Sequence, residues 1–334
     1  MIEISIFKAY DGDCIWIRYG LDNKTNIIID VGYLKGFKSI LLPIFNICLD
    51  RNENIDLLVI THTDRDHISG MKGFRKQKEL LKLVKKAWFN HPYILDGSCE
   101  TDKISFNEGE SVFQLFEENN IQVREKVHNG IEDYSLNDAK FIILSPRLED
   151  LSEYNSDWID NVNTDKVFGV VNDWNNSIHE LATNQNSMDD SKSNLTSISF
   201  LFEFDSKRIL FLGDANPETI VEKLIGLGFA KTNPIQIDCV KLAHHGSKYS
   251  ISDELVSIIN CNQYLVSSNG TNLSKQTLSK LVMHNQEKYK RHVEFYFNYS
   301  SDIYAGLFSN DEIEEFNIKC HFAEEENNYI NLRF

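Results

Sequence analysis

The chain has 334 residues, of which 42% are apolar and 11% aromatic, and its formal net charge is −16. This length and composition predict one large folded domain, or one domain that carries an insertion, and exclude a disordered or low-complexity chain. The acidity opposes non-specific attachment to nucleic acid or to an anionic membrane, although bound divalent metal ions would create a local cationic site for phosphate.

Six cysteines are scattered along the chain without any Cys-x-x-Cys pair. This pattern predicts buried free thiols rather than a thiolate zinc site or a disulfide framework. The first residues alternate like a strand, with no basic region followed by an apolar stretch, and no run reaches the roughly 18 apolar residues of a spanning helix. We therefore expect a cytoplasmic protein that has no membrane partner.

The first part of the chain predicts a meander followed by a helix and a buried strand. Three short β-type segments, at 2–8, 14–20 and 26–32, are separated by turn-forming residues. A helix is expected over 37–52. Residues 55–60, "IDLLVI", form a continuous apolar run that is typical of a strand buried on both faces.

Helices and strands then alternate, which favours sheets covered by helices. We expect helices at 76–87 and 110–120 and strands at 87–90 and 139–146. From about 147 to 193 the sequence turns polar and rich in Asn, Asp and Ser. We interpret this stretch as an insertion or a mobile excursion, because a loop of such length is either functional or disordered.

Regular structure returns with a predicted β-hairpin over 197–213, which places Asp214 at a strand end that faces a helix start. The stretch "IDCVKLAHHGS" follows at 237–247. The remaining elements expected are helices near 252–260 and 275–288 and strands at 263–268, 293–298, 316–322 and 329–334.

The motif "THTDRDHISG", residues 61–70, begins where the buried strand ends and contains His62, Asp64, Asp66 and His67. A divalent first-row metal binds imidazole nitrogen and carboxylate oxygen, and a strand followed by a tight loop can aim several such groups at one point. A solvated turn, in which the aspartates cap a helix and the histidines pack or face water, is the alternative. The metal interpretation gains weight because Asp214 and the His-His pair at 244–245 also follow strand-like runs.

These stretches together resemble the metallo-β-lactamase superfamily. "THTDRDHISG" is similar to its His-x-His-x-Asp-His signature in a His-x-Asp-x-Asp-His variant, and residues 11–32, 193–215 and 240–247 resemble its opening meander, its hairpin with the bridging aspartate and its late histidine motif. The combination most resembles the nuclease-like domain of bacterial DNA-uptake channel proteins. The resemblance implies an α/β, four-layer αββα sandwich in a single domain over 1–334, with the polar insertion inside it.

The resemblance also implies a binuclear metal centre. One metal would be held by His62 and Asp64, and a second by Asp66 and His67, with Asp214 bridging them. One of His244 and His245 would complete the second site. Because adjacent side chains of an extended chain point in opposite directions, we favour His244 as the ligand and leave His245 to contact substrate or donate a proton.

Two departures from the family pattern bear on the first metal: Asp64 stands where many members have histidine, and a further mid-chain histidine has no clear counterpart. His91 is a weak candidate, and His128 and His179 are expected on the surface. Zinc is the favoured ion, with manganese as a competitor because carboxylate replaces imidazole. Asp13 and Asp30 could orient ligand histidines or serve ordinary turns. Lys241 is expected to pair with a carboxylate rather than to meet phosphate.

The sequence therefore predicts a metal-dependent hydrolase in which Asp66 holds the attacking water and His245 protonates the leaving group. A phosphodiester in a nucleotide or a single-stranded nucleic acid is the favoured substrate. Two alternatives stay open: a hydrolase of another small ester or amide, and an interaction component of a bacterial defence or stress system with a structural or degenerate metal centre. A protein partner is compatible with the sequence, which leaves the oligomeric state open.

Overall fold

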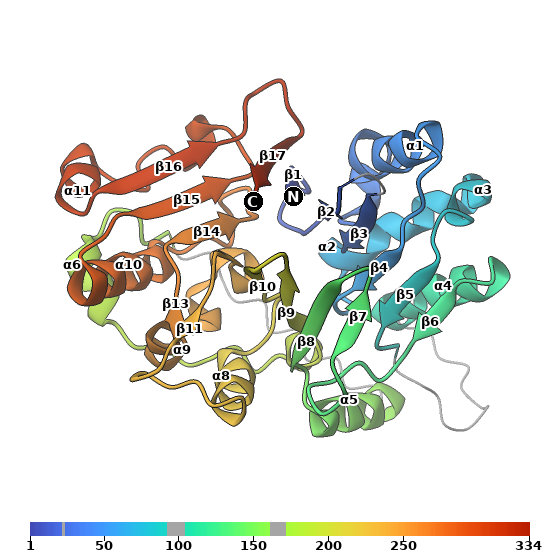
Figure 1. Cartoon of the computed structure of the whole chain (residues 1–334), viewed down its shortest axis with the longest axis horizontal. Coiled ribbons are helices and arrows are strands. Elements are labelled where there is room, and N and C mark those ends of the chain that lie inside the picture. Colours follow the sequence, from blue (N-terminus) through green and yellow to red (C-terminus); the bar gives the residue numbers. More distant parts are fainter. Residues whose placement is uncertain (22–23, 92–103, 161–171) are drawn as a thin grey trace.

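Two large mixed β-sheets lie face to face, and helices cover the outer face of each (Figure 1). The computed structural model describes residues 1–21, 24–91, 104–160 and 172–334. The predicted four-layer αββα arrangement is confirmed.

The first sheet has the strand order β17-β1-β2-β3-β4-β5-β6. Its first three strands form the expected antiparallel meander, β17 pairs with the outer edge of β1, and β3 to β6 run parallel. The strands are β1 Ile2–Phe7, β2 Ile15–Tyr19, β3 Thr25–Ile29, β4 Leu57–Ile60, β5 Lys86–Phe89, β6 Gln122–Arg124 and β17 Tyr329–Arg333.

The second sheet has the order β16-β15-β14-β12-β10-β9-β8-β7. Strands β10, β12, β14, β15 and β16 are parallel, whereas β7 to β10 pair antiparallel, and the predicted hairpin is formed by β9 and β10. The strands are β7 Tyr134–Leu136, β8 Ala139–Ser145, β9 Ser199–Phe204, β10 Lys207–Phe211, β12 Cys239–Lys241, β14 Gln263–Val266, β15 Val293–Phe297 and β16 Ile318–Phe322; β11 Ile235–Gln236 and β13 Ile259–Asn260 form a separate pair.

The helices divide between the two outer layers. Those beside the first sheet are α1 Leu42–Asp50, α2 Arg65–Ile68, α3 Lys78–Leu81 and α4 Ile104–Glu118. The others are α5 Leu148–Asp160, α6 Ile178–Thr183, α7 Lys192–Leu195, α8 Pro217–Gly226, α9 Asp253–Ile258, α10 Lys275–His284 and α11 Asn310–Glu315.

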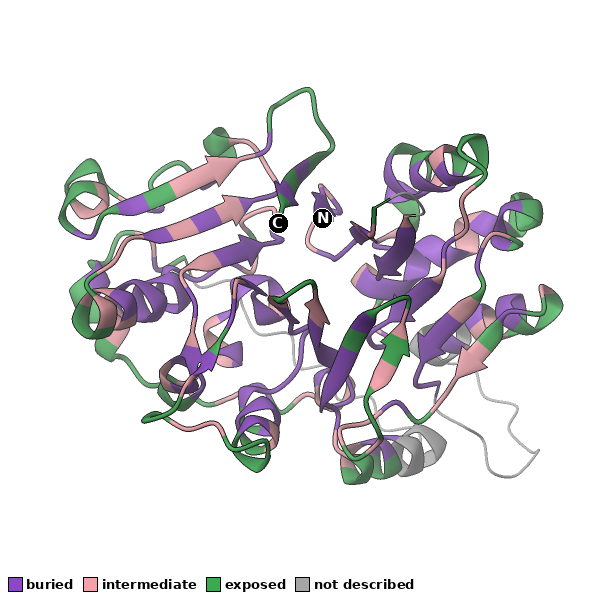
Figure 2. Ribbon diagram, viewed as in Figure 1, coloured by how far each residue is buried: buried purple, intermediate pink, exposed green. Residues whose placement is uncertain are grey.

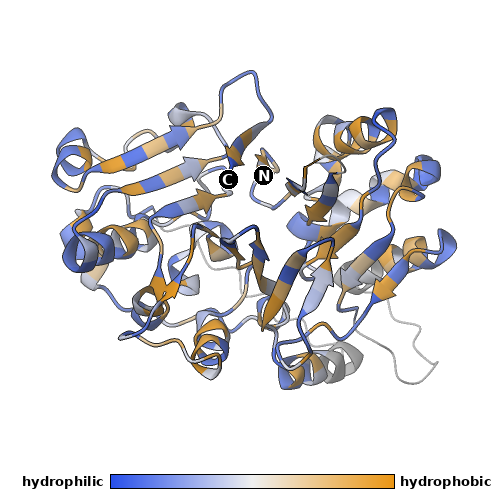
Figure 3. Cartoon of the chain, in the orientation of Figure 1, coloured by the Kyte–Doolittle hydropathy of each residue, from blue (hydrophilic) through white to orange (hydrophobic). Residues whose placement is uncertain are grey.

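Three apolar cores correspond to the three junctions between these layers, and Figures 2 and 3 show the sheets as mostly buried and apolar. The apolar run of strand β4 contributes side chains to two of these cores. Leu57 and Val59 join the core between the sheets, while Leu58 and Ile60 join the core under α1 and α4. The prediction that 55–60 is buried on both faces is therefore confirmed, because successive side chains of a strand point to opposite faces.

The polar stretch 147–193 contains helices where it is described. Helix α5 lies at its start, residues 161–171 fall outside the described residues, and α6 packs against α10. Asp173 accepts hydrogen bonds from the backbone N–H groups of Lys275 (2.8 Å) and Gln276 (3.0 Å) at the start of α10. The segment from 172 onward is thus fastened to the helical layer of the second sheet.

Some predicted boundaries are wrong. The helix expected over 76–87 is only the short α3, since Val84 already bridges to Ile55 and β5 begins at Lys86. The cysteine prediction is confirmed for Cys14, Cys48, Cys239 and Cys261, which are buried free thiols; Cys320 is free and partly exposed, and Cys99 lies outside the described residues. Among the helices that the structure describes, none combines the length and apolarity needed to cross a bilayer.

Candidate metal centre

The candidate centre lies where parallel strands of both sheets end. The motif at 61–70 follows β4 of the first sheet, while Asp214 follows β10 and the His244–His245 pair follows β12 of the second. Parallel strands present their carboxyl ends at one edge of a sheet, and open α/β sheets bind ligands at that edge. Because these edges of the two sheets face each other, the segments that follow β4, β10 and β12 come together although they are far apart in the sequence.

The loop after β4 delivers two histidines from one short stretch. The backbone is extended at Asp64 (φ −68°, ψ 145°) and turns into α2 at Arg65, so that His67 comes back over His62, with ring centroids 4.2 Å apart. His67 Nε2 lies 3.3 Å from Asp66 Oδ2 and 3.4 Å from Asp214 Oδ2. The strand and the turn that follows it thus aim several side chains of the motif at one point, as the sequence predicts.

Asp214 is buried and placed by a glycine turn. Gly213 has φ +51°, a conformation that side chains other than glycine rarely adopt, and this turn carries the chain from β10 toward the centre. The backbone N–H of Asp214 donates to Ser197 Oγ at 3.0 Å. Its carboxylate thereby faces three histidines, at 3.4 Å from His67, 3.7 Å from His245 and 3.9 Å from His244.

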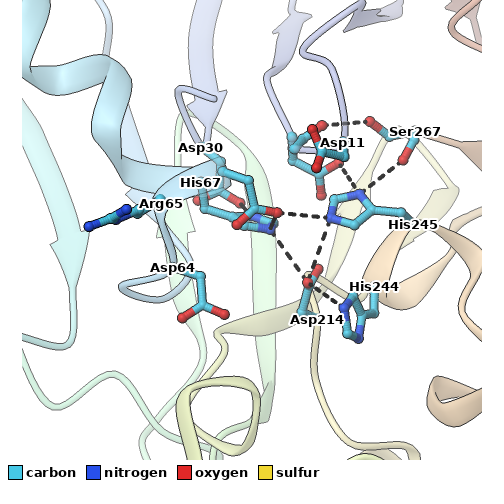
Figure 4. A network of polar contacts seen from close by, with 12 residues as sticks. Asp11, Asp30, Asp64, Arg65, His67, Asp214, His244, His245 and Ser267 are labelled. Atoms are coloured by element: carbon cyan, nitrogen blue, oxygen red, sulfur yellow. Dashed lines mark hydrogen bonds and ion pairs between the residues drawn. The ribbon is translucent and has the colours of Figure 1, made fainter. Parts of the chain in front are cut away.

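His244 and His245 do not lie in extended chain, so the premise that their side chains point in opposite directions is wrong. Both have positive φ, 45° and 57°, and this double left-handed turn directs both Nε2 atoms toward Asp214. Figure 4 shows His67 and His245 pointing toward one another across the centre, with His244 beside Asp214. The other described non-glycine pairs in this conformation, at 137–138 and 205–206, consist of Asn, Asp and Ser in hairpin turns, whereas strain of this kind at other residue types clusters at functional sites.

The partners of the Nδ1 atoms let us assign the tautomers. His245 Nδ1 donates to the backbone carbonyl of Ser267 (2.9 Å), and His67 Nδ1 donates to Asp30 Oδ2 (2.8 Å). The Thr61 hydroxyl donates its only proton to Asp30. Its oxygen can therefore only accept from His62, so His62 Nδ1 is the donor of their 2.9 Å hydrogen bond. In each ring Nδ1 keeps its proton, and Nε2 is the atom that can bind a cation.

The carboxylates of the centre favour a positive charge on the histidine rings as long as no cation is bound. Although burial opposes a charged ring, Asp214, Asp66 and Asp30 raise the pKa of His67 well above 6.5. Burial also opposes charge on His245, yet Asp214, Asp13 and Asp66 raise its pKa to about 10. The pKa of Asp214 is held well below 3.8 by His67, His245 and His244 in spite of its burial. A cation that enters would therefore displace protons from Nε2 atoms.

Several donor atoms at the centre are buried without a hydrogen-bond partner in the described part of the chain. They are His62 Nε2, His67 Nε2, His245 Nε2 and Asp214 Oδ1. Donor atoms lie within 4.8 Å of one another in the set His62, His67 and Asp214 and in the set Asp66, His67 and His245. Buried polar atoms are normally satisfied, so this inward-facing group of nitrogen and oxygen atoms fits a divalent metal.

Other residues with predicted roles lie farther from these sets. Asp64 is 39% exposed, contacts His62 Nε2 at 3.5 Å and accepts a hydrogen bond from Ser193 at 3.2 Å. His91 pairs with Glu110 at 3.3 Å and stacks on Phe113, so it is engaged outside the centre. Both His128 and His179 were expected on the surface. His179 is exposed, and His128 is partly exposed.

Lys241 and Asp13 form a buried ion pair directly behind the centre. The paired role predicted for Lys241 is confirmed, and its ammonium also contacts the Gly213 carbonyl at 3.4 Å. Asp13 Oδ1 lies 3.6 Å from His245 Nδ1, whose hydrogen bond goes instead to the Ser267 carbonyl. Asp13 and Asp30 were expected either to orient histidines or to serve ordinary turns. Asp30 contacts a histidine at 2.8 Å, whereas Asp13 lies at the longer distance of 3.6 Å from His245.

Three contacts were missed at the level of sequence. The Ser267 carbonyl follows β14 at the same sheet edge as Asp214, so its position at a strand end was an available signal. Asp189 and Ser193 lie in the polar segment, where no periodicity distinguishes one aspartate or serine from its neighbours. Asp189 is buried and its Oδ2 lies 3.1 Å from His244 Nδ1.

No protein-family model and no curated protein matches the chain. Among solved structures it is similar to CmlA, a diiron β-hydroxylase from Streptomyces venezuelae (12% identity, TM-score 0.47), covering 99% of this chain and 54% of CmlA, so it spans about half the length of that protein. It is similar to the metallo-β-lactamase fold protein YhfI from Bacillus subtilis (8% identity, TM-score 0.48) and to unliganded yeast PDE1 (10% identity, TM-score 0.41), each over 100% of both chains. At these identities and TM-scores, no property of those proteins is transferred to this chain.

Proposed function

We propose that the protein is a metal-dependent hydrolase of the metallo-β-lactamase fold, with a pair of divalent cations at the centre formed by both sheets. The observation that carries this proposal is the set of buried Nε2 atoms on His62, His67 and His245, which face Asp66 and Asp214 without hydrogen-bond partners among the described residues. Each buried unsatisfied polar atom costs about 1–3 kcal/mol, which cation binding would offset.

The contacts support two cation positions that share Asp214. Asp66, His67 and His245 surround one position, because His245 Nε2 and His67 Nε2 both lie 3.3 Å from Asp66 Oδ2. His62 and Asp64 contribute to the other. We therefore propose His245 as a ligand rather than as the proton donor, since its Nδ1 proton is engaged by Ser267 and the ring is fully buried.

Bound cations of this kind lower the pKa of a water molecule toward neutrality and stabilise negative charge on the oxygens of a reacting ester. Asp66 is the carboxylate of the set that contains His67 and His245, and 21% of its side chain is accessible. It can therefore accept a hydrogen bond from a water entering from solvent and orient that water for attack. Lys241 takes no part in substrate binding, because it is buried against Asp13.

We propose a phosphodiester as the substrate, in a nucleotide or a short single strand. Two cations suit the two free oxygens of a phosphodiester, while the net charge of −16 opposes a broad polyanion-binding surface. The likeness to the nuclease-like domain of DNA-uptake channels rests on motifs alone and remains a prediction. Zinc is the proposed ion and manganese its competitor.

Metal analysis combined with turnover of bis(p-nitrophenyl) phosphate tests this function. The wild-type protein should bind two equivalents of zinc or manganese and hydrolyse the reporter, and a chelator should abolish turnover. His67→Asn should lose both metal and turnover, whereas His179→Asn, which changes an exposed histidine on α6, should keep both. Full metal content and turnover in His67→Asn would contradict the proposal.

The same assay separates the alternatives. Turnover of p-nitrophenyl acetate without turnover of the phosphodiester would indicate a hydrolase of carboxylic esters. Metal bound in full without turnover of either reporter would favour a binding role for the protein.

A further inference from the structure

Asp189 is a buried carboxylate that the polar segment between α6 and α7 brings to the centre. Its side chain is 1% exposed, and its Oδ2 lies 3.1 Å from His244 Nδ1. Asn194 Nδ2 donates to the same oxygen at 2.6 Å, and the backbone N–H of Ser191 donates to Oδ1 at 2.9 Å. Such a carboxylate has little freedom to turn away from the ring.

The backbone of Asp189 is fixed as firmly as its side chain. Its N–H donates to the Tyr249 carbonyl at 2.9 Å, and its carbonyl accepts a hydrogen bond from Asn216 Nδ2 at 2.8 Å. Asn216 caps α8, the helix that follows Asp214. The segment is thereby connected to the same loop that carries the shared carboxylate of the centre.

His244 depends on such an anchor more than the other histidines do. Its side chain is 21% exposed, whereas those of His62, His67 and His245 are fully buried. With Nδ1 held by Asp189, its Nε2 faces Asp214 Oδ2 at 3.9 Å. Carboxylates that accept the Nδ1 proton of a ligand histidine fix the ring and raise the basicity of Nε2.

The cation position of His62 and Asp64 has fewer donors than its neighbour. The one mid-chain histidine with a predicted metal role, His91, is engaged by Glu110 and Phe113. His244 offers a further imidazole for this position, because its Nε2 lies 3.9 Å from Oδ2 of Asp214, the residue common to both positions.

We propose that Asp189 is a positioning residue, which holds the His244 ring so that Nε2 completes the cation position of His62, Asp64 and Asp214. This inference rests on the proposed metal centre. In this assignment His245 binds the cation position of Asp66 and His67, and His244 binds that of His62 and Asp64. The double left-handed turn at 244–245 lets two adjacent histidines serve different positions.

A double-mutant cycle with metal affinity as the readout tests this assignment. The proteins are wild type, Asp189→Asn, His244→Ala and the double variant, loaded with Zn²⁺ and titrated with a chelator of known affinity. Asp189→Asn should weaken one of two equivalents by roughly 10- to 100-fold and leave the other unchanged. His244→Ala should weaken the same equivalent, and the double variant should match His244→Ala, because Asp189 acts through that ring.

Two further measurements separate positioning from a general structural role. Asp190→Asn makes the same charge change at the exposed neighbouring residue and should leave both equivalents unchanged. In Co²⁺-loaded protein, Asp189→Asn should alter the visible absorption of one of the two ions. A general loss of folded structure would instead change the absorption of both ions.

Wild-type affinity in Asp189→Asn, or losses that add in the double variant, would overturn the inference. If Asp189→Asn does not fold, Asn194→Ala removes one hydrogen bond from the same oxygen, together with the 3.4 Å contact between Asn194 Nδ2 and His244 Nδ1. It should weaken the same equivalent to a smaller extent, and unchanged affinity there would equally overturn the inference. Absence of metal from the wild-type protein would instead refute the proposed function, so the two failures are distinguishable.

Discussion

Three histidines of the centre are held in the same way, through a hydrogen bond at Nδ1. In His62, His67 and His245, Nδ1 is tied to an oxygen of the protein, and Nε2 is left for the interior of the centre. The acceptors differ, since they are a hydroxyl, a carboxylate and a backbone carbonyl. The common outcome is a set of rings that cannot rotate away, which is the preorganisation that a functional site requires.

Gly12 permits this preorganisation by having no side chain. A Cβ at residue 12 would lie 2.7 Å from the carbonyl carbon of Asp66 and 2.9 Å from its Cβ, and Asp66 belongs to the first turn of α2. Gly12→Ala should therefore displace Asp66, destabilise the protein by about 1–3 kcal/mol and weaken metal binding, because overpacking forces the backbone to shift. Thermal unfolding and chelator titration measure the two effects.

Gly226→Ala provides the control for that substitution. A Cβ at residue 226 meets no atom within 4 Å, and the residue ends α8, so alanine there should leave metal binding unchanged. If Gly12→Ala bound metal as tightly as Gly226→Ala, close packing against Asp66 would have no part in holding the centre.

Individual residues of the centre differ in how far their positions follow from sequence. His62, Asp66, His67 and Asp214 could be predicted because each follows a strand of recognisable apolar pattern. The roles of His244 and His245 could not, since a double left-handed turn is expected at Asn, Asp or Gly rather than at two histidines. The contact of Asp189 could not be predicted either, because only the packing of a polar segment brings it to His244, 55 residues away in the chain.

Elements with a continuous apolar pattern were predicted well, whereas those stabilised by tertiary contacts were not. Strands β4, β9 and β10 fall where their apolar runs predict them. Helix α6 was missed, because its buried side is provided by Ile178 and Leu181 alone and its remaining support is packing against α10. Periodicity over so few residues cannot be distinguished from that of a loop.

Helix α10 ends on a histidine that should make the stability of the protein depend on pH. Burial, together with Lys288, Arg291 and Lys231, lowers the pKa of His284 to about 4. The folded protein keeps this ring neutral, while the unfolded chain takes up a proton as the pH falls below 6.5, so the contribution is full above pH 6.5 and is lost toward pH 4. His284→Gln should reduce the fall in Tm between pH 7 and pH 5 by about 1–2 °C.

A matched exposed histidine isolates the contribution of burial. His179→Gln removes a titratable ring from the surface of α6 and should leave the pH dependence of Tm close to that of the wild type. An equal change in both variants, or none in His284→Gln, would show that the surroundings of His284 do not disfavour its protonation.

The whole molecule places its candidate centre at a junction rather than within one sheet. His62 and His67 belong to the first sheet through β4, while Asp214 and the His244–His245 pair belong to the second through β10 and β12. The core between the sheets is apolar, so these polar side chains sit at its end. Cations held by both groups would join the sheets and couple metal binding to global stability.

Metal addition should accordingly raise the Tm of the wild-type protein. A cation present at 100 times its Kd adds about 2.7 kcal/mol to the free energy of unfolding, provided that the unfolded chain does not bind it. For a chain of 334 residues this corresponds to roughly 4 °C in Tm. Zn²⁺ and Mn²⁺ should act more strongly than Mg²⁺, which prefers oxygen ligands and retains its waters, because the centre offers imidazole nitrogen.

The excess of acidic residues makes a control for surface binding necessary. Fifty Asp and Glu residues offer many weak sites, and cations bound there would also shift the Tm. His67→Asn removes a donor shared by both sets at the centre and should abolish most of the Zn²⁺-dependent rise, while His179→Asn should preserve it. Equal rises in the wild type and His67→Asn would show that the cations act at the surface, and the two sheets would then be held together by their apolar core alone.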